Sequence, residues 1–343
     1  MKLYFFRKIL LKMVKVNNLV LFLASIALLL LSSILIVIVE NDTFPTLFDG
    51  FWWVMTTVTT VGYGDYFPIS AGGRLIAMFL YIFGIGLIGI VIGKVVDSLA
   101  IYRKKRLEGD IVYKDQGHFV IIGWSQKTEF AVKEMLDTHE DCEIVLIDQL
   151  PEAPMLSENI HYIKGDAGDH NTLEKANITK AKAVLIFADD QMTSNQMIDG
   201  KTLLIASSVE NLAPGVHTIV EVMEEKHINN FKHAQVDEFI VSSETISSLA
   251  VRAAFRKGVS GIYGQLLKRS VGEDLFYIPT RSEWRTYRDA FQNLLSEGAT
   301  LIADRNDLAI NRKLEEPIPD NAELYAVCDK ATYDAILSKG GQS

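Results

Sequence analysis

Two long stretches without a charged side chain constrain this sequence more than any other feature. The first covers residues 19–39 and the second covers residues 75–93. At about 1.5 Å of rise per helical residue, each can cross a hydrocarbon core of about 30 Å. The first stretch is too long for a signal peptide, and no small-residue cleavage site follows it. We therefore predict two membrane-spanning helices.

The charged residues are divided unevenly around these stretches. Residues 1–106 carry 11 Lys and Arg against 5 Asp and Glu, a net charge of +6, whereas residues 107–343 carry 23 against 38, a net charge of −15. Both outer flanks of the stretches are basic, and residues 40–74 between them hold four acidic side chains against one arginine. The positive-inside rule therefore places both termini on the cytoplasmic side of a cell membrane.

Two further expectations follow from the distribution of charge. Residues 1–17 alternate basic and apolar side chains, which predicts a cytoplasmic interfacial segment lying on membrane lipid. The acidic charge of the second half disfavours nucleic acid as a partner.

The segment between the two stretches contains a short sequence suited to binding a dehydrated cation. Residues 45–59 are amphipathic enough to form a short helix, and residues 60–65 then read Thr-Val-Gly-Tyr-Gly-Asp. Rings of backbone carbonyls can replace the hydration shell of a cation without any carboxylate. Glycines at positions 62 and 64 can adopt positive φ, which would let successive carbonyls point toward one axis.

This motif resembles the selectivity filter of potassium channels. The resemblance implies that the permeant K⁺ is bound by the Thr60 hydroxyl and by the carbonyl oxygens of Thr60, Val61, Gly62 and Tyr63. Because two helices cannot enclose a pore alone, the chain is expected to form a homotetramer.

Four further residues are expected to support this filter: Gly64, Asp65, Trp52 and Trp53. The large Tyr63 ring would point backward against the two tryptophans, and Asp65 would lie at the outer mouth, hydrogen-bonded to Trp52. Some relatives have Glu where this chain has Thr56, so the carboxyl–carboxylate bridge behind the filter is expected to be absent.

The second uncharged stretch contains Phe-Gly-Ile-Gly at residues 83–86. This sequence resembles the hinge of the inner helix in potassium channels, where bending opens the cytoplasmic end. Gly84 and Gly86 are therefore the predicted gating hinge. Gly89 and Gly93 can equally serve close helix packing.

The second half of the chain alternates predicted strands with predicted helices. This alternation predicts a parallel sheet covered on both faces, a Rossmann-like unit. The expected strands are 118–123, 143–148, 160–164, 183–187 and 217–222. The expected helices are 126–138, 169–176, 193–211 and 225–234.

An NAD-linked enzyme is one alternative for such a unit. Its fingerprint is a G-x-G-x-x-G loop after the first strand and an acidic residue after the second. Asp148 supplies the acid, but residues 123–128 read Gly-Trp-Ser-Gln-Lys-Thr and lack the glycines. Trp124 and Thr128 stand where a pyrophosphate requires close backbone approach, so no catalytic residue is expected. A membrane-anchored nucleotide sensor without ion flux is a second alternative.

This half of the chain resembles an RCK domain, the regulator of potassium conductance. The resemblance rests on residues 118–125, 164–167 and 173–176. Together with the filter, it implies a prokaryotic two-transmembrane, RCK-gated potassium channel of the MthK type. The implied fold is multi-domain, with an α-helical pore domain of outer, pore and inner helices, then a Rossmann-like α/β RCK domain with a small α/β C-terminal lobe.

The resemblance also implies domain boundaries. After the interfacial segment 1–17, we expect a pore domain over 18–98, a linker over 99–116, the Rossmann-like subdomain over 117–242, a helix-turn-helix dimerisation crossover over 243–268, and the C-terminal lobe over 269–343. Four chains bring four RCK domains where family rings have eight, so additional soluble RCK subunits are an open alternative.

The gating ligand is open between a divalent cation such as Ca²⁺, an adenine nucleotide and protons. In calcium-gated relatives, carboxylates near the ends of the fourth and fifth strands hold the ion. Here only Glu221 matches, because Phe187 and Met223 take the other two places and supply no oxygen. All seven histidines lie within residues 107–343, and histidine titrates near neutral pH.

For a nucleotide, Asp148 and Asp166 match the places where related RCK domains bind the ribose and the base. The candidate ligand site therefore comprises Gly123, Ser125, Asp148, Asp166, Asp189, Asp190 and Glu221, with Glu221 as the candidate metal ligand.

Overall fold

The computed structural model describes residues 18–139, 141–268 and 272–340. The predicted interfacial segment 1–17 lies outside the described residues. The chain divides into two compact units, Met1–Lys105 and Arg106–Ser343, which we describe separately.

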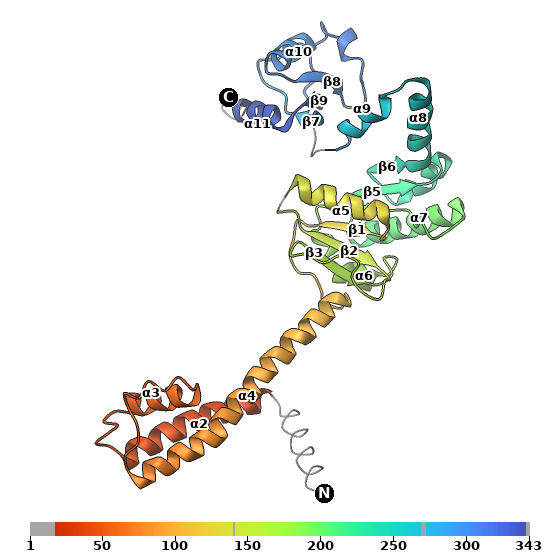
Figure 1. The fold of residues 1–343 in the computed structure, drawn as a ribbon. Coiled ribbons are helices and arrows are strands. Elements are labelled where there is room, and N and C mark those ends of the chain that lie inside the picture. Colours follow the sequence, from red (N-terminus) through yellow and green to blue (C-terminus); the bar gives the residue numbers. More distant parts are fainter. Residues whose placement is uncertain (1–17, 140, 269–271, 341–343) are drawn as a thin grey trace. The chain divides into compact units, whose positions relative to one another are not determined.

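The described residues of the first unit form three helices: α2 (Asn18–Val39), α3 (Leu47–Val58) and α4 (Ala71–Leu107). Both α2 and α4 are long and apolar enough to cross a membrane, as predicted. The shorter α3 begins at a capping box, in which Thr46 and Asp49 each bond the other's backbone N–H. The three helices lie together (Figure 1) and share one core, made of Ile36, Phe44, Trp53, Val54, Val58, Ala77 and Leu80.

Helix α4 is longer than the uncharged stretch that predicted it. Its start is held by the buried Glu40, whose carboxylate accepts hydrogen bonds from Ile69 N (2.9 Å) and Ser70 N (2.5 Å). At its other end the charged residues 103–106 continue the helix, since Lys and Arg are good helix formers. Part of the predicted linker 99–116 is therefore helical.

The second unit begins with a six-stranded sheet in which every paired strand is parallel. The strand order is β3-β2-β1-β4-β5-β6, and the order reverses between β1 and β4. The Rossmann-like fold is thus confirmed. The strands are β1 (Phe119–Ile122), β2 (Ile144–Asp148), β3 (Ile160–Lys164), β4 (Ala183–Ile186), β5 (His217–Val222) and β6 (Glu238–Val241).

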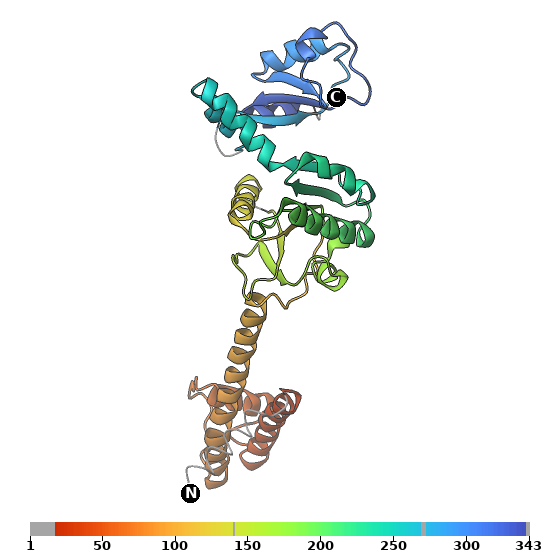
Figure 2. The ribbon, with the colours of Figure 1, turned by 90° about the vertical axis from the view of Figure 1, so that its right-hand side faces the viewer.

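Helices cover both faces of this sheet, because its strands are apolar on both faces. On one face Ile121, Leu146 and Tyr162 pack with α5. On the other face Val120, Val145 and neighbouring residues pack with the remaining helices (Figure 2). The elements are α5 (Gln126–Thr138), α6 (His170–Lys175), η1 (Ile178–Lys180), α7 (Asn195–Leu212) and η2 (Glu225–His233). The helical stretch expected at 225–234 is the 3-10 helix η2.

Two helices and a small lobe follow the sheet. The helices are α8 (Ser242–Phe255), which begins one residue before the predicted crossover range 243–268, and α9 (Val259–Leu266), and neither buries a residue within the chain. The lobe has an antiparallel sheet, β7-β9-β8, around its own core. Its elements are β7 (Asp274–Ile278), α10 (Tyr287–Ser296), β8 (Thr300–Asp304), η3 (Ile310–Arg312), β9 (Leu324–Cys328) and α11 (Lys330–Gly340).

Candidate ion filter and candidate ligand pocket

The segment after α3 leaves regular secondary structure at the predicted filter. Gly62 and Gly64 have φ values of 56° and 76°, the left-handed region that glycine adopts without a steric penalty. Thr60 also has a positive φ, 64°, which the sequence did not predict. Hydrogen bonds tie this segment to the end of α3, because Gly62 N donates to Thr56 O at 3.0 Å.

Trp52 braces the predicted filter through two contacts. Its indole stacks on the Tyr63 ring, with centroids 5.9 Å apart and planes 3° from parallel. Its Nε1 donates a hydrogen bond to the Asp65 carboxylate at 2.8 Å. Both contacts agree with expectation. Trp53 lies instead in the helix core, with its ring 5.4 Å from that of Phe44.

Thr56 occupies the buried position behind this segment. Its hydroxyl donates to Trp53 O at 3.1 Å within α3. A threonine offers no carboxyl group to bridge to Asp65, and Asp65 is bonded to Trp52. The brace of this filter segment therefore depends on an indole–carboxylate bond.

The two predicted hinge glycines have different surroundings. A Cβ built on Gly84 would lie 2.8 Å from Val58 Cγ2, whereas a Cβ on Gly86 would meet nothing within 4 Å. Helix α4 continues through both positions without a break. Gly84 therefore allows α4 to approach the end of α3 closely, a packing role that the sequence did not reveal.

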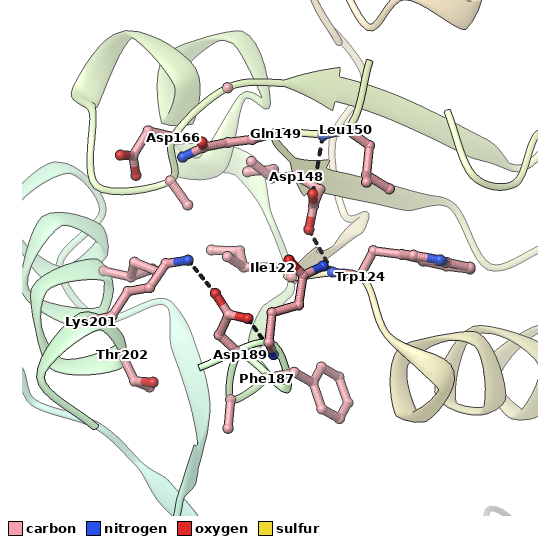
Figure 3. A pocket seen from close by; sticks show the side chains of 17 residues that line it. Ile122, Trp124, Asp148, Gln149, Leu150, Asp166, Phe187, Asp189, Lys201 and Thr202 are labelled. Atoms are coloured by element: carbon pink, nitrogen blue, oxygen red, sulfur yellow. Dashed lines mark hydrogen bonds and ion pairs between the residues drawn. The ribbon is translucent and has the colours of Figure 1, made fainter. Parts of the chain in front are cut away.

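A pocket of about 270 Å³ lies at the carboxyl ends of β1 to β4 (Figure 3). Ligands of open α/β sheets bind in this place, next to the point where the strand order reverses. Four of the predicted ligand-site residues line the pocket: Gly123, Asp148, Asp166 and Asp189. It is also lined by polar residues that the sequence did not single out, namely Gln149, Gln191, Lys201 and Thr202.

The Asp148 carboxylate organises the loops at one side of this pocket. It accepts hydrogen bonds from Trp124 N at 2.7 Å and from Leu150 N at 3.1 Å. Trp124 also lines the pocket, and its indole points away from the labelled polar side chains in Figure 3. Thr128 donates its hydroxyl to Gly123 O at 2.8 Å, and Ser125 caps α5 outside the pocket.

Lys201 supplies a positive charge at the opposite side. Its ammonium lies 2.7 Å from the Asp189 carboxylate (Figure 3). The hydrogen bond from Lys201 holds the pKa of Asp189 below its ordinary value. The pocket is thus lined by carboxylates, side-chain amides and the ammonium of Lys201. Lys201 is the one basic residue of α7, which is the only sequence signal that could have pointed to it.

Glu221, the predicted metal ligand, forms an ion pair with the side chain of Lys127. It is buried, and both its oxygens lie 2.9 Å from Lys127 Nζ, while Ala188 N donates to it at 2.8 Å. Lys127 also pairs with Asp190 at 2.7 Å. Among the described residues, no group of three or more His, Cys, Asp or Glu side chains could hold a metal ion. The geometry therefore speaks against a metal at Glu221, because a lysine ammonium neutralises the carboxylate.

Comparison with known proteins agrees with both parts of this description. An ion-channel family model matches residues 20–100, and a TrkA-N domain model matches residues 119–242. The chain is 35% identical over 314 residues to the putative potassium channel protein YugO of Bacillus subtilis, covering 91% of this chain and 93% of that relative. The chain belongs to the prokaryotic potassium channels with a TrkA-N (RCK) domain.

One further relative and one solved structure have lower identity to this chain. The calcium-gated potassium channel TvoK of Thermoplasma volcanium is 28% identical over 305 residues, which cover 88% of this chain and 84% of the relative. Among solved structures, the GsuK channel shares the fold at 20% identity and a TM-score of 0.50, over 69% of this chain. The match spans 63% of that solved chain, less than two thirds of its length.

The structure separates the seven predicted RCK residues into groups by their position. Gly123, Asp148, Asp166 and Asp189 meet in the pocket, whereas Asp190 and Glu221 meet at Lys127. Sequence reasoning did not identify Lys127 and Lys201, because a lysine acquires its role here from a carboxylate distant along the chain.

Proposed function

We propose that this chain forms a homotetrameric, K⁺-selective channel in a cell membrane, gated by ligand binding to a cytosolic RCK ring. The observation that carries the proposal is the filter segment, with left-handed Gly62 and Gly64 held from behind by Trp52. Both termini are placed on the cytoplasmic side by the charge distribution. Ion movement would be passive and would need no catalytic residue.

The chemistry of the filter follows from the cost of dehydration. Four copies of residues 60–63 would surround one axis with rings of carbonyl oxygens, which replace the hydration shell of K⁺. The Thr60 hydroxyls would add a ring at the inner end. The Trp52 contacts to Tyr63 and Asp65 support this arrangement, because irregular backbone at membrane depth requires packing behind it.

Pairing of RCK domains is the second part of the proposal. The crossover helices α8 and α9 expose large apolar side chains, including Ile246, Phe255 and Ile262 at 68%, 88% and 63% exposure. Exposed apolar surface of this kind is typical of a protein–protein interface. A second RCK domain would cover it, either from another subunit of the tetramer or from an additional soluble RCK subunit.

An adenine nucleotide is the ligand that the pocket favours. Asp148 and Asp166 line the pocket and would accept hydrogen bonds from a ribose and a base, and Lys201 would leave Asp189 to pair with a phosphate. The relative TvoK is named as calcium-gated, so a divalent cation is the second candidate. The pairing of Glu221 with Lys127 disfavours it at that carboxylate. Any gating ligand must bind one state of the ring more tightly than the other.

The test measures binding to the purified full-length channel. ADP, ATP and Ca²⁺ are titrated by calorimetry against the wild type, Lys201→Met and the matched surface variant Lys133→Met. Loss of one charged hydrogen bond predicts about tenfold weaker nucleotide binding for Lys201→Met. Lys133→Met should bind as the wild type does.

Two outcomes would contradict the assignment of a nucleotide as the ligand: nucleotide binding that is unaffected by Lys201→Met, or binding of Ca²⁺ without binding of ADP or ATP. Turnover of NADH would favour the enzyme alternative, and none is expected.

A further inference from the structure

The first unit contains a groove that the channel function does not use. About 630 Å³ in volume, it lies between α2, the end of α3 and the second half of α4. Its walls are almost entirely apolar, with residues such as Leu21, Leu29, Val58 and Val91. One charged side chain, Lys94 of α4, is among the residues that line it.

The part of the groove that precedes Lys94 fits within one leaflet of a bilayer. Its α4 wall runs from Leu87 to Leu99. At about 1.5 Å per residue, the part from Leu87 to Lys94 is about 10 Å long, about two thirds of one leaflet of a hydrocarbon core of about 30 Å. Several lining residues are strongly exposed, including Phe22 and Val95 at 62% and 55%, so the groove is open along its side.

Lys94 lies on the α4 wall of the groove, between Val91 and Val95. The uncharged stretch of α4 ends at Gly93, so Lys94 marks the boundary of the hydrocarbon core. The side chain is half-buried, and no ion pair joins it to any residue that the structure describes. Basic side chains between membrane helices on the cytoplasmic side bind anionic lipid headgroups.

We propose that this groove binds one acyl chain of an anionic phospholipid from the cytoplasmic leaflet, with the lipid phosphate paired to Lys94. The apolar walls bury the chain, and the Lys94 ammonium selects the negative headgroup over a zwitterionic one. The inference rests on the proposed membrane placement, which puts Lys94 on the cytoplasmic side. Because the groove joins α2 to α4, its occupant contacts the helix that carries the predicted hinge.

The test measures lipid retained by the purified full-length protein in native mass spectrometry. Phosphatidylglycerol and phosphatidylcholine are added in equal amounts to the wild type, Lys94→Gln and Arg103→Gln. Arg103 lies on the same helix outside the groove and controls for general attraction to negative lipid. A charge near the membrane surface contributes about 1 kcal/mol, so Lys94→Gln should retain about fivefold less phosphatidylglycerol. Arg103→Gln should match the wild type.

A second variant tests the groove itself. Ser25 lines it from α2, and Ser25→Phe would fill the space with a ring. This variant should retain neither lipid, whereas Lys94→Gln should retain both without preferring phosphatidylglycerol over phosphatidylcholine. Equal retention of the two lipids by the wild type, as a neighbouring helix seated in the groove would give, overturns the proposal. The proposal is also overturned if Lys94→Gln and Arg103→Gln reduce the retained phosphatidylglycerol by the same amount.

Potassium flux in phosphatidylcholine liposomes, measured separately, keeps this proposal distinct from the channel function. Absent flux with lipid preference intact would remove the channel function alone. Flux without lipid preference would remove the lipid site alone.

Discussion

Lys127 holds two acidic residues together at the carboxyl ends of β4 and β5. It pairs with the half-exposed Asp190 and with the buried Glu221. Burial by itself would lower the pKa of Lys127, but the hydrogen bonds from Asp190 and Glu221 outweigh it and raise the pKa above the ordinary value. The lysine therefore stays charged across the physiological range and serves as a fixed internal cation.

Removal of this cation should destabilise the RCK domain. Lys127→Met leaves the buried Glu221 carboxylate without its charged donor, which is expected to cost about 1–3 kcal/mol. The exposed i,i+4 pair of Lys133 with Glu129 provides the control, and Lys133→Met should change stability by at most about 0.5 kcal/mol. The thermal midpoint of the full-length protein checks both variants. Equal thermal midpoints for Lys127→Met and Lys133→Met would show that the Lys127 ion pairs stabilise the domain no more than an exposed pair does.

At the scale of elements, α4 is positioned by its contact with the end of α3. Gly84 is buried against Val58, and the two residues join a helix of the predicted pore lining to the helix that precedes the filter. A side chain at position 84 therefore acts on packing as well as on any bending of the helix.

Gly84→Ala is expected to lower the stability of the tetramer by about 1–3 kcal/mol, because the new methyl group overpacks against Val58. It should also lower the open probability in single-channel recordings without altering ion selectivity. The double variant Val58→Ala/Gly84→Ala should be less destabilised than the sum of its single changes, which a double-mutant cycle measures. Gly89→Ala, with open space around its Cβ, is the neutral control. If the free-energy changes of the two single variants add strictly, the contact between positions 58 and 84 is not the cause of the destabilisation.

A second element, the strap of residues 106–117, is fastened onto the sheet of the second unit. Lys164 N donates to Gly109 O at 3.1 Å, and His161 Nε2 donates to Ile111 O at 2.7 Å. Under the strap lies His118, fully buried, whose Nε2 donates to Ala176 O at 2.9 Å. Its ring packs on Tyr113, and its Nδ1 has no hydrogen-bond partner among the described residues.

The stability of this strap should depend on pH. Burial lowers the pKa of His118 below its ordinary value of 6.5, so the folded chain binds the proton less readily than the unfolded chain. Stability is therefore complete above about pH 6.5 and falls as the pH drops below that value. His118→Gln keeps a donor for Ala176 O without titrating. Thermal midpoints between pH 7.5 and 5.5 should fall less in this variant than in the wild type or in His170→Gln, which alters an exposed histidine. If the thermal midpoint of His118→Gln falls as steeply as that of the wild type, His118 is not the cause of the pH dependence.

The accuracy of prediction from the sequence differs between these elements. Residues 217–222 form β5 as expected, since β-branched residues, here Thr218, Ile219, Val220 and Val222, favour a strand. Strand β6 was missed because its four residues run directly into α8 and carry no turn signal of their own. The Trp52–Tyr63 contact was predictable because both residues are close in sequence and one of them must be packed. The Lys127–Glu221 pair, 94 positions apart, depends on tertiary structure that local patterns do not encode.

At the scale of the whole molecule, the two units have separate cores and separate tasks. The first, with its uncharged helices and filter segment, is proposed to conduct K⁺. The second, with its pocket at the strand ends, is proposed to bind the ligand that gates the pore. The single chain explains neither task completely, because four filter segments must meet around an axis and the exposed faces of α8 and α9 require a partner.

The most direct test of this account is the ion selectivity of the purified full-length protein in a planar bilayer. Current is recorded under opposed K⁺ and Na⁺ gradients, with ADP and then Ca²⁺ added to the RCK side, for the wild type and for Gly62→Ala. Alanine is strained at the left-handed backbone of position 62, and Gly89→Ala controls for a glycine change in a helix. The account predicts a K⁺-selective current in the wild type and in Gly89→Ala, and none in Gly62→Ala. A current carried equally by Na⁺, or one that survives unchanged in Gly62→Ala, would contradict it.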